Sequence, residues 1–254
     1  MRRIIIIGTA LAVLGAATIA YAATDQNSYA GSGLAISKGS GKNVPLSMVE
    51  ALKAANKTAG NRAAALTNIK VKIAGVKLDV GKLPVCTDAK IEQNKTNPLG
   101  GCSKNSLIGS GLVNALLGAG DKPKDAGTAC NPHLNVFNGG PSTQVFYFWT
   151  NSANDCGGLT TGATAPYDGH ISYSGGSAVI NVPLPPDIST KVANQPNLWG
   201  SLIKESLNFG KKVAGKTYMV NTSCKGSRKW SITFTASQYG GGSATSTVSG
   251  SSKC

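Results

Sequence analysis

The chain has 254 residues, with 25 Lys and Arg against 11 Asp and Glu, a net charge of +14 and 32 glycines. Its hydrophobic content of 41% excludes a disordered polyelectrolyte. The glycines follow no triplet period, which also excludes a collagen-like rod. The composition therefore predicts a globular protein with a core, and the length fits one compact domain.

The N-terminus has the three parts of a secretory signal peptide. Met1-Arg2-Arg3 is a basic region, residues 4–17 are apolar, and Ala20-Tyr21-Ala22 fits the small-x-small cleavage rule. The apolar run is shorter than the roughly 18 residues of a spanning helix, so we expect cleavage after Ala22 and no transmembrane segment afterwards. The chain is thus expected to comprise a signal peptide (1–22), a flexible N-terminal segment (23–45) and a single β-rich secreted domain (46–254).

The mature chain begins with polar residues, among which Leu34-Ala35-Ile36 predicts one edge strand. Residues 46–66 fit a short amphipathic helix, or a strand followed by a turn near Gly60. From residue 69 onward apolar and polar residues alternate, which is typical of half-buried strands. The expected strands are residues 69–73, 76–80, 134–137, 144–149, 170–174, 178–182, 217–221, 229–236 and 245–248.

Glycine-rich turn signals separate nearly all of these strands, for example Asn138-Gly139-Gly140 and Gly240-Gly241-Gly242. Many short strands joined by such turns predict an all-β fold, either a β-sandwich or a closed sheet. Residues 107–117 and 198–213 instead have a composition that suits helices. At most one or two short helices are therefore expected.

All six cysteines follow the predicted signal peptide, and an even number in an exported chain predicts three disulfides. Six cysteines allow many pairings, and the sequence leaves the choice open. Pairing of neighbours closes the shortest loops and joins Cys86 to Cys102, Cys130 to Cys156, and Cys224 to Cys254. A metal site is not expected, because no C-x-x-C pair occurs and His133 and His170 lack the spacing of zinc ligands.

Short motifs spread over most of residues 60–254 carry a resemblance. They are Gly60-Asn61-Arg62, Lys82-Leu83-Pro84-Val85-Cys86, Cys102-Ser103-Lys104-Asn105-Ser106, Ile108-Gly109-Ser110-Gly111, Val136-Phe137-Asn138-Gly139, and Thr222-Ser223-Cys224 with Lys229-Trp230 and Cys254. These motifs resemble those of a group of secreted actinobacterial proteins of unknown function. The resemblance implies an exported, β-rich, disulfide-stapled domain with the first and third cysteine pairings, and it implies no catalytic residues. Cys130 and Cys156 depart from the group's pattern.

Motifs of common hydrolases do not occur in the sequence. There is no G-x-S-x-G elbow, and Asp168-Gly169-His170 fits a turn entering a strand better than part of a serine triad. A carboxylate pair would have to come from Asp25, Glu50, Asp79, Asp88, Glu92, Asp121, Asp125, Asp155, Asp168, Asp187 and Glu205, which lie mainly in apparent loops. No catalytic residue and no cofactor is therefore expected.

The run Phe146-Tyr147-Phe148-Trp149 is the densest apolar feature after the signal peptide. Alternation places Phe146 and Phe148 on one face of a strand and Tyr147 and Trp149 on the other. We expect a central strand buried on both faces, because large aromatic side chains are usually buried. An aromatic platform for a sugar or peptide is the alternative.

Net positive charge is the one positive indication of function. It predicts attraction to anionic polymers outside the cell. The candidate binding residues on the polar faces of adjacent predicted strands are Lys70, Lys72, Lys77 and Lys82, for which an ordinary solvated lysine face is the alternative. Sequence-specific nucleic-acid binding is not expected, since no helix-turn-helix, zinc-finger or RRM-type motif occurs.

The leading hypothesis is therefore a non-enzymatic exported protein of the cell envelope or the extracellular space that binds an anionic surface polymer or like subunits. One alternative is a secreted hydrolase acting through a carboxylate pair, which would require a deep pocket where two carboxylates converge. The other is a self-assembling surface protein, which would require an exposed apolar strand edge.

Overall fold

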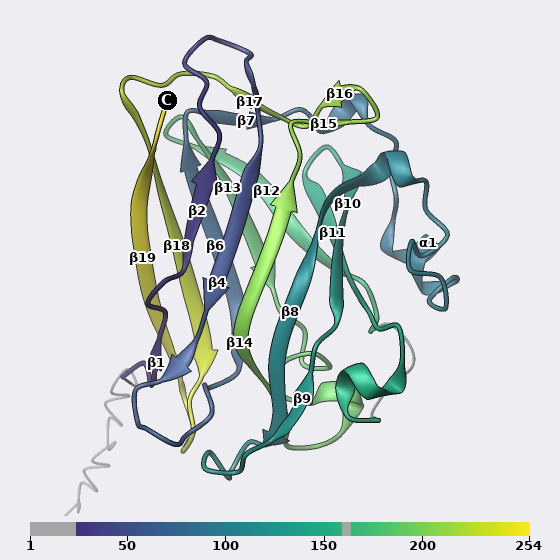
Figure 1. Ribbon diagram of the computed structural model, residues 1–254, viewed down its shortest axis with the longest axis vertical. Coiled ribbons are helices and arrows are strands. Elements are labelled where there is room, and N and C mark those ends of the chain that lie inside the picture. The colour runs from purple at the N-terminus through teal and green to yellow at the C-terminus, as the bar shows by residue number, and fades with distance from the viewer. Residues whose placement is uncertain (1–23, 159–163) are drawn as a thin grey trace, which may run out of the picture.

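The computed structural model describes residues 24–158 and 164–254, so the predicted signal peptide lies outside the described residues. Antiparallel strands make up most of the regular secondary structure, which confirms the all-β prediction (Figure 1). Within the described residues the one α-helix is α1 (Asp88–Glu92), with five residues. No helix in these two ranges has the length and apolar character needed to span a membrane.

Most strands belong to one antiparallel sheet of twelve strands. Across the sheet these are β19 (Ser243–Lys253), β18 (Ser227–Ser237), β6 (Leu66–Ala74), β13 (Ser177–Pro183), β12 (Tyr167–Ser174), β11 (Thr143–Trp149), β10 (His133–Gly140), β8 (Leu107–Ala119), β14 (Leu198–Phe209), β4 (Met48–Lys53) and β2 (Gly33–Ile36), with β9 (Thr128–Cys130) paired to β8. Each strand expected from the sequence overlaps a strand of the structure.

Shorter elements cover the ends of this sheet. The strands are β1 (Asn27–Ser28) with β5 (Ala55–Asn56), β15 (Lys212–Val213) with β16 (Lys216–Thr217), and β3 (Pro45–Leu46), β17 (Met219–Asn221) and β7 (Val76–Leu78) in one small sheet. The 3-10 helices are η1 (Val80–Lys82), η2 (Lys104–Ser106), η3 (Ala153–Cys156) and η4 (Val192–Asn194). In Figure 1 β7, β17, β15 and β16 lie at the top, and β9 lies at the bottom.

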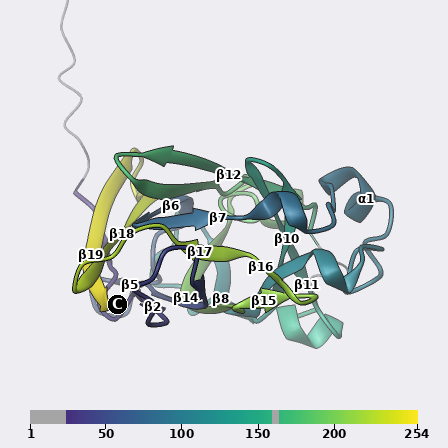
Figure 2. The same cartoon turned by 90° about the horizontal axis from the view of Figure 1, so that it is seen from above.

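The large sheet curls over until its two edge strands, β2 and β19, meet. The Ser252 hydroxyl accepts a hydrogen bond from the Ile36 amide at 3.4 Å and donates to the Leu34 carbonyl at 3.3 Å. Viewed from above, β6 and β12 form one layer and β14 and β8 the opposite layer (Figure 2). The fold is therefore a β-sandwich whose two layers are continuous with each other.

The core lies between these layers and follows from strict alternation along the strands. On β6, Ile69, Val71 and Ile73 are buried in the core, while Lys70 and Lys72 are exposed on the outer face. This is the pattern of a half-buried strand, with every second side chain turned inward.

A second, smaller core lies on the outer face of β10 and β11, where residues 84–106 cover the sheet. The Tyr147 hydroxyl donates to the Lys95 carbonyl at 2.7 Å, and Asn135 donates to the Pro98 carbonyl at 2.8 Å. Tyr147 is fully buried in this cluster, whereas Phe146 is buried against the main core. The strand is thus covered on both faces along these residues, as its aromatic run predicts.

Three disulfides staple the fold, and each joins neighbouring cysteines in the sequence. The pairs are Cys86–Cys102, Cys130–Cys156 and Cys224–Cys254. These are the pairs that the shortest loops favour. The first bridge holds the segment over the smaller core, and the third ties the C-terminus to the loop before β18.

Three stretches with helical composition are strands in the structure. Residues 46–66 contain β4, residues 107–117 lie within β8, and residues 198–213 contain β14. Intrinsic helix preference is a weak prior that tertiary context overrides. In β8 the tertiary context is the pairing with β14. The two strands approach so closely that a Cβ on Gly111 would lie only 2.0 Å from the Ser206 carbonyl oxygen of β14.

One further expectation differs from the structure. Asp168 and Gly169 do not form a turn but pair within β12 against Val145 and Gln144 of β11. Gly169 suits this strand because a Cβ there would lie 2.6 Å from the Phe146 ring. The edge strand expected at Leu34-Ala35-Ile36 is present as β2, and Leu34 and Ile36 are buried in the core.

Candidate binding cavity

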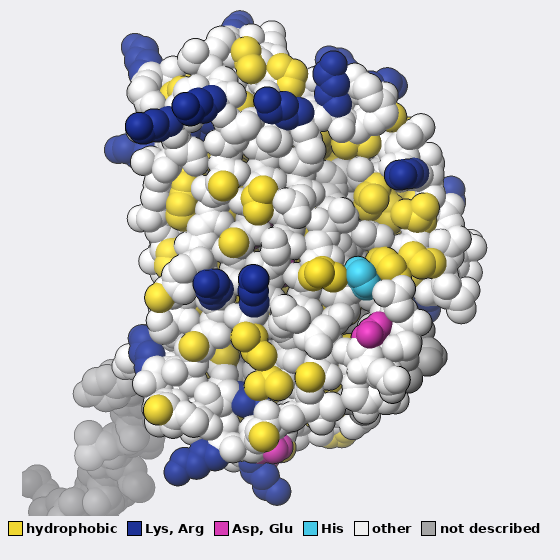
Figure 3. All heavy atoms as spheres, in the orientation of Figure 1, with side chains coloured by type: hydrophobic (Ala, Val, Ile, Leu, Met, Phe, Trp, Pro, Cys, Tyr) yellow, Lys and Arg dark blue, Asp and Glu magenta, His cyan; other side chains and the backbone are white. Residues whose placement is uncertain are grey.

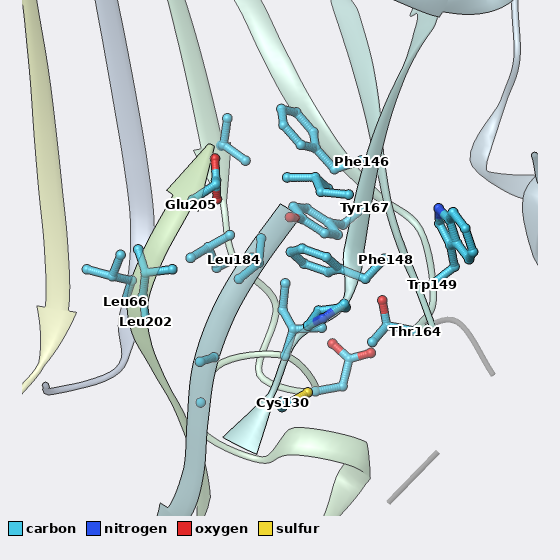
Figure 4. A pocket seen from close by; sticks show the side chains of 18 of the residues that line it. Leu66, Cys130, Phe146, Phe148, Trp149, Thr164, Tyr167, Leu184, Leu202 and Glu205 are labelled. Carbon is cyan, nitrogen blue, oxygen red and sulfur yellow. The ribbon is translucent and has the colours of Figure 1, made fainter. Parts of the chain in front are cut away.

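A cavity of about 560 Å³ lies between the two layers of the sandwich. That volume is in the range of pockets that hold small molecules. Its walls are mainly apolar and come from both layers (Figure 4). The apolar lining includes Leu66, Ile69, Val71, Val113, Leu134, Phe146, Phe148, Ile180, Val182, Leu184, Leu202, Leu207 and Phe209.

Two glutamates, Glu50 on β4 and Glu205 on β14, line this cavity. In the register of the two strands Glu50 lies opposite Leu207 and Glu205 opposite Leu52. The glutamates are therefore diagonal neighbours on one face of the sheet, a spacing within reach of long side chains. They are only 7% and 8% exposed.

Both carboxyl groups lack a compensating partner in the part of the chain that the structure describes. Among the described residues, no hydrogen bond or salt bridge involves the side chain of Glu50 or Glu205. Burial raises the pKa of Glu50 to about 7. Burial, together with the charge of Glu50, raises the pKa of Glu205 to about 8. Both carboxyl groups therefore keep their protons to a higher pH than a solvent-exposed glutamate does.

An aromatic wall is the second feature of the cavity. Tyr167 of β12 lies between two rings of β11, with centroid distances of 5.4 Å to Phe146 and 5.9 Å to Phe148. Figure 4 shows the three rings side by side, with Glu205 across the cavity from them. Burial raises the pKa of Tyr167, and the negative charges of Glu205 and Asp187 add to the effect.

The remaining charged residues of the lining are Glu92, Lys95 and Asp187. Lys95 is bound to Glu92, with its Nζ 2.6 Å from Oε1. Asp187 forms no salt bridge within the described residues. Acidic residues therefore outnumber basic residues in the cavity lining, whereas basic residues outnumber acidic residues in the whole chain.

The positions of the two glutamates in the sequence indicate their burial, although they belong to no catalytic motif. Both lie in stretches whose composition also fits a helix, yet Glu50 stands between Met48 and Leu52 in the inward phase of an alternating strand. Glu205 stands likewise two residues before Leu207, in the phase that is buried. An acidic residue in the apolar phase of a strand indicates a carboxyl group that faces the interior.

The lysines predicted to bind a polymer lie outside this cavity. Lys70 and Lys72 are exposed on the outer face of β6, and Lys77 is exposed on β7 in the small end sheet. Lys82 forms a salt bridge with Asp79, with 2.7 Å between Nζ and Oδ2. The four residues therefore do not form one continuous strand face, since they divide between the large sheet and the end of the molecule.

The two histidines, for which the sequence predicts neither a metal site nor a triad, lie in different surroundings. His133 stacks on Trp149 with a centroid distance of 4.2 Å, and His170 lies on β12 opposite Thr143. In residues 24–158 and 164–254 no group of three or more His, Cys, Asp or Glu side chains could hold a metal ion.

Comparison of the chain with protein-family models, curated proteins and solved structures gives no match.

Proposed function

We propose that the protein is an exported, non-enzymatic binding protein that takes an apolar small molecule into the interior of its β-sandwich. The observation that carries this proposal is the cavity of about 560 Å³ with a mainly apolar lining. Pockets of this size and character bury most of a small ligand's surface, and a few polar groups fix its orientation. Here Glu50, Glu205 and Tyr167 supply those polar groups.

The three disulfides indicate an oxidising compartment. The signal-peptide pattern of residues 1–22 supports secretion to the extracellular space or the cell envelope. In that compartment the protein would carry or sequester apolar molecules, which are poorly soluble in water.

We favour binding over hydrolysis through a carboxylate pair. Glycoside hydrolases place their two carboxyl groups on either side of the bond that is cleaved. Glu50 and Glu205 instead project from adjacent strands of one wall. We also disfavour assembly through an apolar strand edge, because the edge strand β19 consists mainly of Ser and Thr.

Fluorescence titration with the neutral apolar dye N-phenyl-1-naphthylamine tests this proposal. We expect saturable binding of one dye per protein, because the cavity lies in a single domain. The Val113→Phe variant, which fills the cavity from β8, should weaken binding at least about tenfold. Leu112→Phe is the matched control, since residue 112 is the next on the same strand and is 52% exposed. Equal binding by the two variants would place the dye elsewhere and contradict the proposal.

A second candidate function, binding of an anionic surface polymer, is favoured by the distribution of lysines. The segments 37–46, 75–82, 210–226 and 253–254 converge at the end of the molecule that is at the top of Figure 1. They contain one acidic residue, Asp79, and the exposed lysines Lys38, Lys42, Lys77, Lys82, Lys211, Lys212, Lys216, Lys225 and Lys253. Figure 3 shows basic side chains gathered along this end. We name this surface the basic end.

Cosedimentation with purified cell walls over a range of salt concentrations tests this second function. We expect wild-type retention that is lost as salt rises, because exposed charges are screened. The variant K211Q/K212Q/K216Q removes three charges from the basic end and should release the protein at lower salt. K70Q/K72Q/K204Q removes three charges from strand faces and serves as the control. Equal losses in both variants would show that net charge, and not the basic end, holds the protein.

A further inference from the structure

We infer that the ligand of the cavity carries a protonated amine on an apolar body, and that Glu50 and Glu205 together receive the amine. This inference rests on the proposed function and names the chemical class of ligand. It starts from the contrast between the cavity and the rest of the protein.

The cavity concentrates acidic residues in a basic protein. Its lining includes four of the chain's 11 acidic residues, Glu50, Glu92, Asp187 and Glu205, but only one of its 25 basic residues, Lys95. Lys95 already pairs with Glu92. Three carboxyl groups are therefore left without a cation among the described residues that line the cavity. A cationic ligand complements this lining because it favours the ionised form of these carboxyl groups, whereas an anionic ligand gains no such partner.

The two buried glutamates have the geometry to bind one ammonium group. They are diagonal neighbours on the inward face of β4 and β14, and the protein supplies neither with a hydrogen-bond donor in the described residues. Burying a carboxylate without a partner is costly, which favours either a proton or a counter-ion. An ammonium group has three N–H donors and no acceptor, so it can donate to both carboxylates at once.

The aromatic wall provides the rest of the site. Phe146, Tyr167 and Phe148 present a row of rings to the cavity, across from Glu205 (Figure 4). Aromatic faces attract cations and also bury apolar groups. An amine with an alkyl or aromatic body can therefore place its charge at the glutamates and its body along the rings.

Displacement of the bound dye by three ligands of equal chain length tests the inference. These are decylamine, 1-decanol and decanoate, which are cationic, neutral and anionic at pH 7. We expect decylamine to displace the dye at a concentration at least about tenfold below that of decanol, because hydrogen bonds between charged groups exceed neutral ones. Decanoate should be the weakest competitor.

The variant E50Q/E205Q keeps the size of both side chains but removes their charge. Its preference for decylamine over decanol should fall below about threefold, with both displacements measured against the dye affinity of the variant itself. D88N/D121N removes two charges from exposed positions and should retain the full preference. Equal displacement by the amine and the alcohol, or a preference that survives in E50Q/E205Q, would overturn the inference. Absence of dye binding in the first titration would instead reject the proposed function itself.

Discussion

The free energy of unfolding is expected to fall by at least about 3 kcal/mol between pH 5 and pH 8.5 in the ligand-free protein. Burial raises the pKa values of Glu50 and Glu205 from 4.5 to about 7 and about 8. Between pH 4.5 and these values the folded state binds more protons than the unfolded chain. Stability is therefore highest at the acid side of this window and is lost as the carboxyl groups ionise. Chemical denaturation at several pH values measures the effect.

The double variant E50Q/E205Q separates this effect from the titration of other groups. The neighbouring titratable groups of the cavity, Tyr167 and Asp187, are unchanged in it. We expect its stability to vary much less over the same range and to exceed that of the wild type at pH 8.5. A pH profile identical to that of the wild type would show that the two glutamates are not buried as uncompensated acids.

Removal of the Cys86–Cys102 disulfide is expected to cost roughly 4 kcal/mol of stability. About 3 kcal/mol comes from the unfolded state, because the bridge closes a loop with a sequence separation of 16. The remainder comes from packing, since Cys86 and Cys102 are buried in the smaller core with Ile91, Phe137 and Tyr147. Denaturant unfolding of the C86A/C102A variant measures this loss, and proteolysis should cut first within residues 87–101.

The C224A/C254A variant is the comparison for this experiment. Its bridge spans a longer separation of 30 residues, but both cysteines are only half-buried. Loop length alone would make C224A/C254A the less stable of the two variants. Because packing adds to the loss at the smaller core, we expect C86A/C102A to be less stable. The opposite order would contradict the role assigned to that core.

Much of the fold could be predicted from the sequence because the strands alternate clearly. On β6 the period of two separates Ile69, Val71 and Ile73 from Lys70 and Lys72, and the six cysteines pair with their neighbours. The composition of residues 107–117 and 198–213 did not distinguish helix from strand, because Leu and Ala occur both in helices and in buried strands. On β8 the structure differs from composition because the strand pairs with β10 on one side and β14 on the other, and composition does not encode these long-range pairings.

The cavity could be predicted only in part. The inward phase of Glu50 is present in Met48-Val49-Glu50-Ala51-Leu52, and that of Phe146 in its aromatic run. Their meeting in one cavity depends on the order of strands, because β4 and β11 are separated in the sheet by β14, β8 and β10. This arrangement comes from the curling of the whole sheet, which no local pattern specifies.

A crystal structure of the protein grown with decylamine tests the central claim most directly. We predict an alkyl chain inside the sandwich along Phe146, Tyr167 and Phe148, with its nitrogen within hydrogen-bond distance of both Glu50 and Glu205. A cavity that contains only water while decylamine is bound at the surface would contradict the claim.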